Sequence, residues 1–181
     1  MRLRSALVSA LTAGAVGAAL ASTATAAPSA APVAPDRAAS RPGVCPEKDL
    51  EVRAAPGGRT NVARLSVTHH GTKTCVVDRI PTVTFRGLDG SAQPVPPSKS
   101  GPYTLARGER AYAAVRTADP KTAEGHVVRS LSVAADPSHV GVTFPRSAVG
   151  MPGGVHVWEP LTTLWQRSSA AADRALADAT R

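Results

Sequence analysis

Aromatic residues, cysteine and methionine are scarce in this chain. Aromatic residues make up 3% of the 181 residues, and there are only two cysteines and two methionines. A core must therefore be packed mainly from Val, Leu, Ala and Ile. The shortage of aromatic rings also argues against nucleic acid as a partner, because single-strand binding platforms stack bases on such rings.

Sequence motifs of catalysis are missing as well. There is no G-x-S-x-G elbow, no phosphate-binding glycine loop and no H-E-x-x-H pair. Several acids stand in turn sequences, such as Asp89 in LDGS, Asp119 in ADPK and Asp136 in ADPS, where Asp side chains initiate turns. We therefore predict no enzyme and no cofactor. The alternative left open is a hydrolytic or metal-dependent enzyme whose site is assembled only in the fold.

The one long hydrophobic run lies at the N-terminus. Arg2 and Arg4 precede it, residues 6–20 are almost wholly apolar, and residues 24–26 form a small-x-small cleavage site. This pattern predicts a signal peptide over residues 1–26. The run is too short and too poorly flanked for an anchor, so we expect no integral membrane span. The protein is then expected to be secreted and soluble, either extracellular or in the cell envelope.

Acidic residues are outnumbered by basic ones, and the net charge is +8. Loss of Arg2 and Arg4 with the signal peptide leaves 19 cations against 13 acids, a net charge of +6. This excess would suit an anionic polymer. However, Lys and Arg stand singly, without a run of five, which favours solvated strand faces over a binding patch. The partner stays unknown, with a cell-wall component, an anionic polymer and another protein as candidates.

The rest of the chain divides into a linker, a strand-rich domain and a tail. Residues 27–43 are rich in Ala and Pro and predict a disordered linker. Residues 44–160 contain short alternating apolar segments between turn residues, which predict an all-β fold, an antiparallel Ig-like β-sandwich of about 7–9 strands. The predicted strands are residues 50–54, 62–69, 74–77, 82–86, 103–106, 111–117, 127–134, 140–144 and 155–158.

Residues 161–181 are predicted to be a short helical or disordered tail. Its last fourteen residues are rich in helix formers, but Leu176 is the only large apolar residue among them. The tail is therefore not expected to bury an apolar stripe. Trp158 and Trp165 are expected to cover an open edge of the sandwich.

The two cysteines, Cys45 and Cys75, are predicted to form a disulfide, because exported proteins meet an oxidising environment. In the chain-entropy account this crosslink contributes roughly 3.7 kcal/mol. We interpret the segment that follows residue 62 as a hairpin, with Val67 opposite Cys75 and Leu65 opposite Val77. The apolar residues then face the core.

This register places His69 and His70 at a solvent-facing turn. Adjacent strand residues point to opposite sides, so the two rings are not expected to share a metal ion. Met151 is the only methionine besides the initiator, too few for a copper carrier. The remaining histidines are isolated and would matter only if the fold assembled a site: His126, His139 and His156.

The stretch LSVTHHGTKTCVVDRIPTVTF, followed by GLDG and YTLARGERAYAAV, resembles an exported actinobacterial protein family, domain of unknown function 4232. The resemblance covers residues 45–158. The matching positions are Thr68, Gly71, Lys73, Thr74, Cys75, Pro81, Val83, Asp89, Gly90, Leu105 and Gly108.

The chain departs from that family at three points. His69 stands where the family usually has Asn, Arg79 and Ile80 replace a Gly-Tyr corner, and a second cysteine pair is absent. The resemblance implies a fold and an export route. It implies no activity and provides no functional residues to transfer. Our leading hypothesis from the sequence is a non-catalytic binding module outside the cell or in its envelope.

Overall fold

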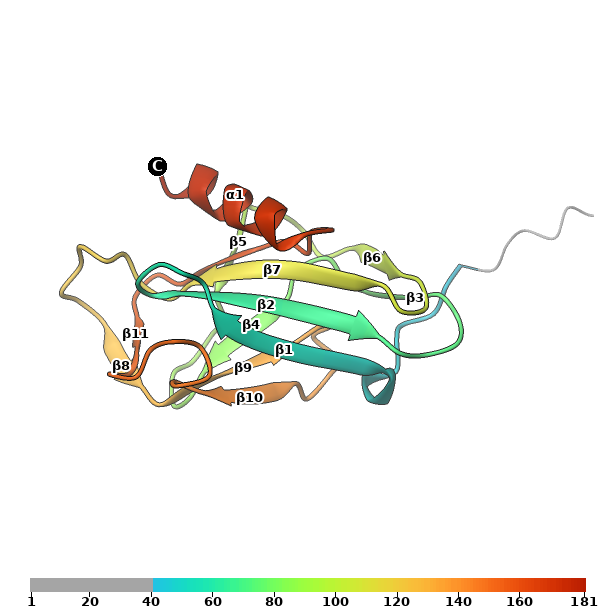
Figure 1. Ribbon diagram of the computed structural model, residues 1–181, viewed down its shortest axis with the longest axis horizontal. Helices are drawn as coiled ribbons and strands as arrows, with labels where there is room; N and C mark the ends of the chain where they lie inside the picture. Colours follow the sequence, from blue (N-terminus) through green and yellow to red (C-terminus); the bar gives the residue numbers. More distant parts are fainter. Residues whose placement is uncertain (1–40) are drawn as a thin grey trace, which may run out of the picture. The chain divides into compact units, whose positions relative to one another are not determined.

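The computed structural model describes residues 41–181. The predicted signal peptide, residues 1–26, and residues 27–40 of the predicted linker lie outside the described residues. Residues 41–181 fold into β-strands with one C-terminal α-helix (Figure 1), which confirms the predicted all-β class. The elements are a 3-10 helix η1 (Glu47–Asp49), β1 (Leu50–Pro56), β2 (Val62–His69), β3 (Cys75–Asp78), β4 (Thr82–Phe85), β5 (Gln93–Val95), β6 (Pro102–Leu105), β7 (Arg110–Arg116), β8 (His126–Val128), β9 (Ser130–Ala134), β10 (Val142–Pro145), β11 (Val155–Val157), β12 (Leu161–Thr163) and α1 (Ser169–Ala179).

One five-stranded sheet organises the domain. Its order is β1-β2-β7-β12-β5, and three smaller sheets have the orders β10-β9-β4, β11-β8 and β3-β6. All pairs are antiparallel except β12 with β5. Figure 1 shows this sheet between α1 on one side and β4, β9 and β10 on the other. The architecture is thus a sandwich with a helix on its outer face. Within residues 41–181, no helix has the length and apolar content needed to cross a bilayer.

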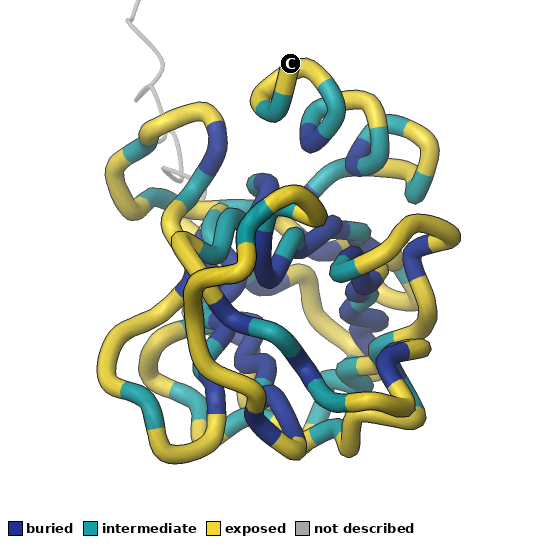
Figure 2. The backbone as a smooth tube through the Cα atoms, turned by 90° about the vertical axis from the view of Figure 1, so that its left-hand side faces the viewer, coloured by how far each residue is buried: buried dark blue, intermediate teal, exposed yellow. Residues whose placement is uncertain are grey.

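The five-stranded sheet buries both of its faces. In β7, Ala111, Ala113 and Val115 point into the main core between the sheets. Ala114 points the other way, into a second cluster beneath α1. This follows from the period of two along a strand, since successive side chains lie on opposite faces. Figure 2, seen toward one end, shows buried segments facing one another across the interior and exposed residues along the outer loops.

The C-terminal tail is an ordered part of the domain, and the expectation that it buries no apolar face was wrong. Ala172 and Leu176, four residues apart on α1, are fully buried against the outer face of the sheet. The Ser168 side chain caps the helix by accepting a hydrogen bond from the Ala171 N–H at 3.2 Å. One leucine and one alanine are enough to bury this face of α1, because the sheet supplies the other residues of the apolar cluster, Val62, Val95 and Ala114.

Residues 161–165 belong to the sandwich rather than to the predicted tail. Leu161–Thr163 form β12, which lies between β7 and β5. Trp165 is 3% exposed and packs in the main core. Trp158 is more exposed, at 39%. Of the two tryptophans expected at an edge, one is therefore a core residue.

Residues 41–181 contain twelve strands, where the sequence predicted seven to nine. The predicted strand 127–134 is two strands, β8 and β9, which pair with different partners. Burial alternates through Arg129, but Ser130 and Leu131 are both buried, so the inward phase shifts by one residue where β9 begins. β5 contains Pro94, which argues against a strand, but β5 is an edge strand, where proline is tolerated.

The predicted β2–β3 hairpin is wrong. β2 pairs with β1 on one side and β7 on the other, so it has no free edge for β3. Val67 lies opposite Val52 and Ala111, and β3 pairs instead with β6. The expected inward-facing set is nevertheless buried: Leu65, Val67, Cys75 and Val77. Two strands that face one core from different sheets show the same alternation as a hairpin, which is why the pattern misled.

Candidate functional site

The structure brings His69 to the Cys45–Cys75 disulfide. Cys45 and Cys75 are joined, with their Cα atoms 4.9 Å apart. Backbone pairing holds Cys45 in place, since its N–H donates to the Val76 carbonyl at 2.8 Å. Both cysteines are buried. The predicted disulfide therefore links the start of the domain to β3.

His69 is buried at 1% exposure, and its predicted position at a solvent-facing turn was wrong. It ends β2 in the same phase as Ala63, Leu65 and Val67, all of which face the main core. This alternation was visible in the sequence and would have placed His69 inward had it been followed one step further. His70, the next residue, points to the opposite side and is exposed, because adjacent side chains in a strand lie on opposite faces.

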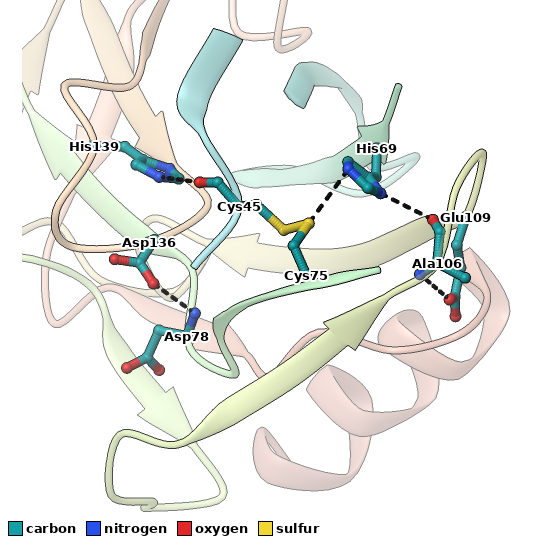
Figure 3. The surroundings of a disulfide bond; sticks show 8 residues. All are labelled: Cys45, His69, Cys75, Asp78, Ala106, Glu109, Asp136 and His139. Atoms are coloured by element: carbon teal, nitrogen blue, oxygen red, sulfur yellow. Dashed lines mark hydrogen bonds between the residues drawn. A yellow bond between two sulfur atoms is a disulfide. The ribbon is translucent and has the colours of Figure 1, made fainter. Parts of the chain in front are cut away.

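The imidazole of His69 is held between two contacts (Figure 3). Its Nδ1 lies 3.1 Å from the Ala106 carbonyl oxygen, and its Nε2 lies 3.3 Å from Cys75 Sγ. Because a carbonyl only accepts, Nδ1 carries the hydrogen in the neutral ring, and Nε2 presents a lone pair to the sulfur. A disulfide sulfur has no hydrogen to donate. The lone pair of Nε2 is therefore buried against a group that cannot satisfy it.

A hollow of about 270 Å³ opens beside this pair. Its lining includes Asp49, His69, Gly71 and Cys75. Glycine is required at position 71 by close approach, because a Cβ there would stand 2.4 Å from His69 Nε2 and 3.2 Å from Asp49 Oδ2. The histidine, the sulfur and one carboxylate thus border a common space.

The other histidines do not come together within the described part of the chain. His139 Nε2 lies 3.0 Å from the Cys45 carbonyl oxygen, and His156 Nε2 lies 2.6 Å from the Glu124 carbonyl oxygen. His126 is exposed on β8. In residues 41–181, the one group of three or more potential metal-ligating side chains is Cys45, His69 and Cys75.

The buried and half-buried acids near the disulfide stabilise turns. Asp136 accepts hydrogen bonds from the Ser138 hydroxyl and N–H and from the Asp78 N–H. Burial raises the pKa of Asp136, but these hydrogen bonds outweigh it and leave the pKa below its ordinary value. Asp78 in turn accepts from the Ile80 N–H and the Ser100 hydroxyl. Each carboxylate is thereby committed to neighbouring donors.

A second feature lies at the opposite end of β2, around the β1–β2 turn, residues 57–61. Gly58 and Asn61 take positive φ angles of 76° and 59°, conformations that glycine and asparagine adopt most readily. Arg59, in this turn, lies between two hollows of about 560 and 400 Å³. Gly58 and Arg59 line both, so the hollows meet at this turn. We call the combined depression the Arg59 groove.

Five cations and two acids line the Arg59 groove, a local net charge of +3: Arg59, Arg64, Arg116, Lys121 and Arg174 against Asp119 and Asp173. They come from the turn, β2, β7, the segment after β7 and α1. Sequence reasoning favoured scattered solvated charges, and this gathering was missed because it depends on where α1 docks.

Two of the five cations are paired. Arg64 forms a bidentate contact with Asp173 of α1, in which Nε lies 3.1 Å from Oδ1 and Nη2 lies 2.6 Å from Oδ2. Hydrogen bonding to Asp173 raises the pKa of Arg64. Arg116 lies 3.6 Å from Asp119. The other three cations form no ion pair within residues 41–181 and are exposed: Arg59, Lys121 and Arg174.

Arg116 also has an unused donor. Its Nε is buried without a hydrogen-bond partner among residues 41–181. A buried guanidinium N–H normally has a hydrogen-bond partner, because a buried donor without a hydrogen bond costs free energy. Three of the groove's cations thus have no acidic partner within residues 41–181, which is the arrangement that suits an anionic ligand.

One comparison with known proteins gave a match. A family model described as a domain of unknown function (DUF4232) matches residues 45–165. The match runs from the first cysteine of the disulfide to Trp165, the core tryptophan before α1. Neither a search of curated proteins nor a search of solved structures found a significant match.

Proposed function

This chain belongs to the DUF4232 family, and from that premise we propose that it is a non-catalytic binding module outside the cytoplasm, whose ligand is an anionic polymer held in the Arg59 groove. The predicted signal peptide and the disulfide support a location outside the cytoplasm. The observation that carries the ligand class is the groove's net charge of +3, in which three of the cations form no ion pair with any residue of the described part of the chain.

A polymer suits this surface better than a small anion. The two hollows adjoin at Arg59 and together extend from Lys121 to Arg174, so several anionic groups along one chain could be engaged at once. Repeated weak contacts of this kind add up through effective concentration. Guanidinium groups are also the side chains best shaped for phosphate, sulfate and carboxylate oxygens.

The test compares two single variants that remove the same charge. Arg59→Gln removes a cation of the groove, at the end of the sheet where β7 ends. Arg107→Gln removes an exposed cation that precedes the first residue of β7. β7 has seven residues, so the two sites are separated by roughly 20 Å. Heparin and inorganic polyphosphate serve as probes, with retention and Kd measured over a range of salt concentrations.

We expect Arg59→Gln to weaken binding by about tenfold, because one charge-assisted hydrogen bond is worth about 1.5 kcal/mol. Arg107→Gln should shift binding only slightly, and Arg59→Gln combined with Arg174→Gln should weaken it further. Equal effects of the two single variants would mean that overall charge alone drives retention, and absence of binding at low salt would overturn the proposal outright.

A further inference from the structure

We propose that Cys45, His69 and Cys75 are the protein ligands of a zinc ion, which the protein takes up once the disulfide has been reduced. The three side chains stand at the other end of β2 from the Arg59 groove, since His69 ends this strand and Val62 begins it. The zinc site therefore neither requires nor excludes an anionic ligand at the groove.

The donor atoms are already close together. Cys45 Sγ, Cys75 Sγ and one nitrogen of His69 all lie within 4.8 Å of one another. Zinc binds thiolate sulfur at about 2.3 Å and imidazole nitrogen at about 2.0 Å in a tetrahedral arrangement, so its donors are roughly 3.5 Å apart. When the S–S bond opens, the two sulfurs must move apart, while His69 Nε2 already stands 3.3 Å from Cys75 Sγ. Side-chain rotations can supply this change.

The orientation of His69 is the one that a metal ligand needs. Its Nδ1 contacts the Ala106 carbonyl at 3.1 Å, which keeps the hydrogen on Nδ1 and the lone pair on Nε2. Histidines that bind metals nearly always donate their other N–H in this way. Within residues 41–181, the partner of this lone pair in the disulfide form is Cys75 Sγ, which has no hydrogen to donate, so zinc would give Nε2 a partner that the oxidised protein lacks there.

The fourth position would face the hollow beside Gly71. This space, about 270 Å³, is lined by His69 and Cys75 and by one carboxylate, Asp49. Either water or Asp49 could complete a tetrahedral site there, and both are ordinary oxygen ligands of zinc. Because glycine at position 71 removes the Cβ that would stand 2.4 Å from His69 Nε2, the ring keeps an open side.

The chemistry balances with a dithiol as reductant. Two electrons and two protons pass from the dithiol to the Cys45–Cys75 bond, which opens to two thiols, while the dithiol closes to its own disulfide. Zinc then displaces the two thiol protons and binds the thiolates, with neutral His69 as the third ligand. The site thus couples metal uptake to the redox state of the surroundings.

The experiment uses the full mature protein without a histidine tag. Oxidised protein and protein reduced with a phosphine, which offers no competing thiol, are each mixed with zinc and desalted, and zinc per chain is measured by mass spectrometry. We expect about one zinc per reduced chain and none per oxidised chain. Cobalt substitution adds a spectroscopic readout, because thiolate-to-cobalt charge-transfer absorption reports sulfur ligation directly.

The matched variants are His69→Gln and His70→Gln, which change adjacent histidines on opposite sides of the strand. His69→Gln should weaken zinc binding at least about tenfold, and His70→Gln should leave it unchanged. Circular dichroism shows whether each reduced protein is folded. Absence of zinc from reduced wild type, equal affinity in both variants, or a reduced chain that stays unfolded when zinc is added would each overturn the proposal.

Discussion

Replacing Leu176 by alanine tests whether α1 is an integral part of the domain. Leu176 is fully buried between the helix and the outer face of the five-stranded sheet. The substitution removes three carbon atoms, which at about 0.8 kcal/mol each amounts to roughly 2.4 kcal/mol of lost burial. A residual cavity adds to this, and measured Leu→Ala changes in cores run from about 2.7 to 5 kcal/mol.

We expect Leu176→Ala to lower the free energy of unfolding by about 3 kcal/mol, toward the low end of that range, because a helix on the sheet surface can settle partly into the space. For a domain of this size the melting temperature should fall by roughly 10 °C. Urea denaturation followed by tryptophan fluorescence measures the first quantity, and calorimetry measures the second.

Arg174→Ala is the matched control, since Arg174 is an exposed residue of the same helix. It should change stability by no more than about 0.5 kcal/mol. Hydrogen exchange across residues 169–179 adds local information, because a helix that undocks alone would exchange faster without a global transition. Equal stability of wild type and Leu176→Ala, with unchanged exchange in α1, would refute the docking of this helix.

Two further predictions concern the disulfide region. Gly71→Ala should lower the free energy of unfolding by about 1–3 kcal/mol, because its Cβ would lie 2.4 Å from the ring nitrogen of His69. The control is Gly43→Ala, which should leave the melting temperature nearly unchanged, because nothing lies within 4 Å of its Cβ. Similar melting temperatures for the two variants would contradict the close approach at Gly71. Since hydrogen bonds lower the pKa of Asp136 below 3.8 in the folded protein, its charged form stabilises the fold above that pH, and this contribution is lost as the pH falls through the folded pKa. Asp136→Asn should therefore be less stable than wild type at pH 7 and approach it in urea denaturation as the pH falls below 3.8 toward the folded pKa, whereas Asp89→Asn, at an exposed turn position, should change stability at pH 7 by no more than about 0.5 kcal/mol.

The individual strands could be predicted from local pattern because their physical cause is local. Residues such as Leu65 and Val67 alternate with polar neighbours, and a period of two fixes which side chains share a face. The burial of Leu65, Val67, Cys75 and Val77 follows from this rule, whereas the burial of Thr68 and Asp78 in the opposite phase does not. The prediction of the Cys45–Cys75 bridge needed only two cysteines and a predicted signal peptide.

The pairing of the strands was not determined by that pattern. β2 and β3 face one core from different sheets, and nothing in their alternation distinguishes this from a hairpin. β12 and β5 were missed because three residues, LTT in one and QPV in the other, are too few to show a period. Their strand conformation comes from neighbours that are distant in sequence.

The sequence by itself determined the all-β class, the inward and outward faces of the long strands, the disulfide and the excess of positive charge, since each of these depends on composition or on neighbours along the chain. Only the tertiary structure decided that α1 docks on the sheet, that single arginines and a lysine gather around Arg59, and that His69 meets the disulfide. The physical reason is that these contacts join residues far apart in sequence, Arg64 with Asp173 for one, and their positions follow from how the sheets pack rather than from any local preference.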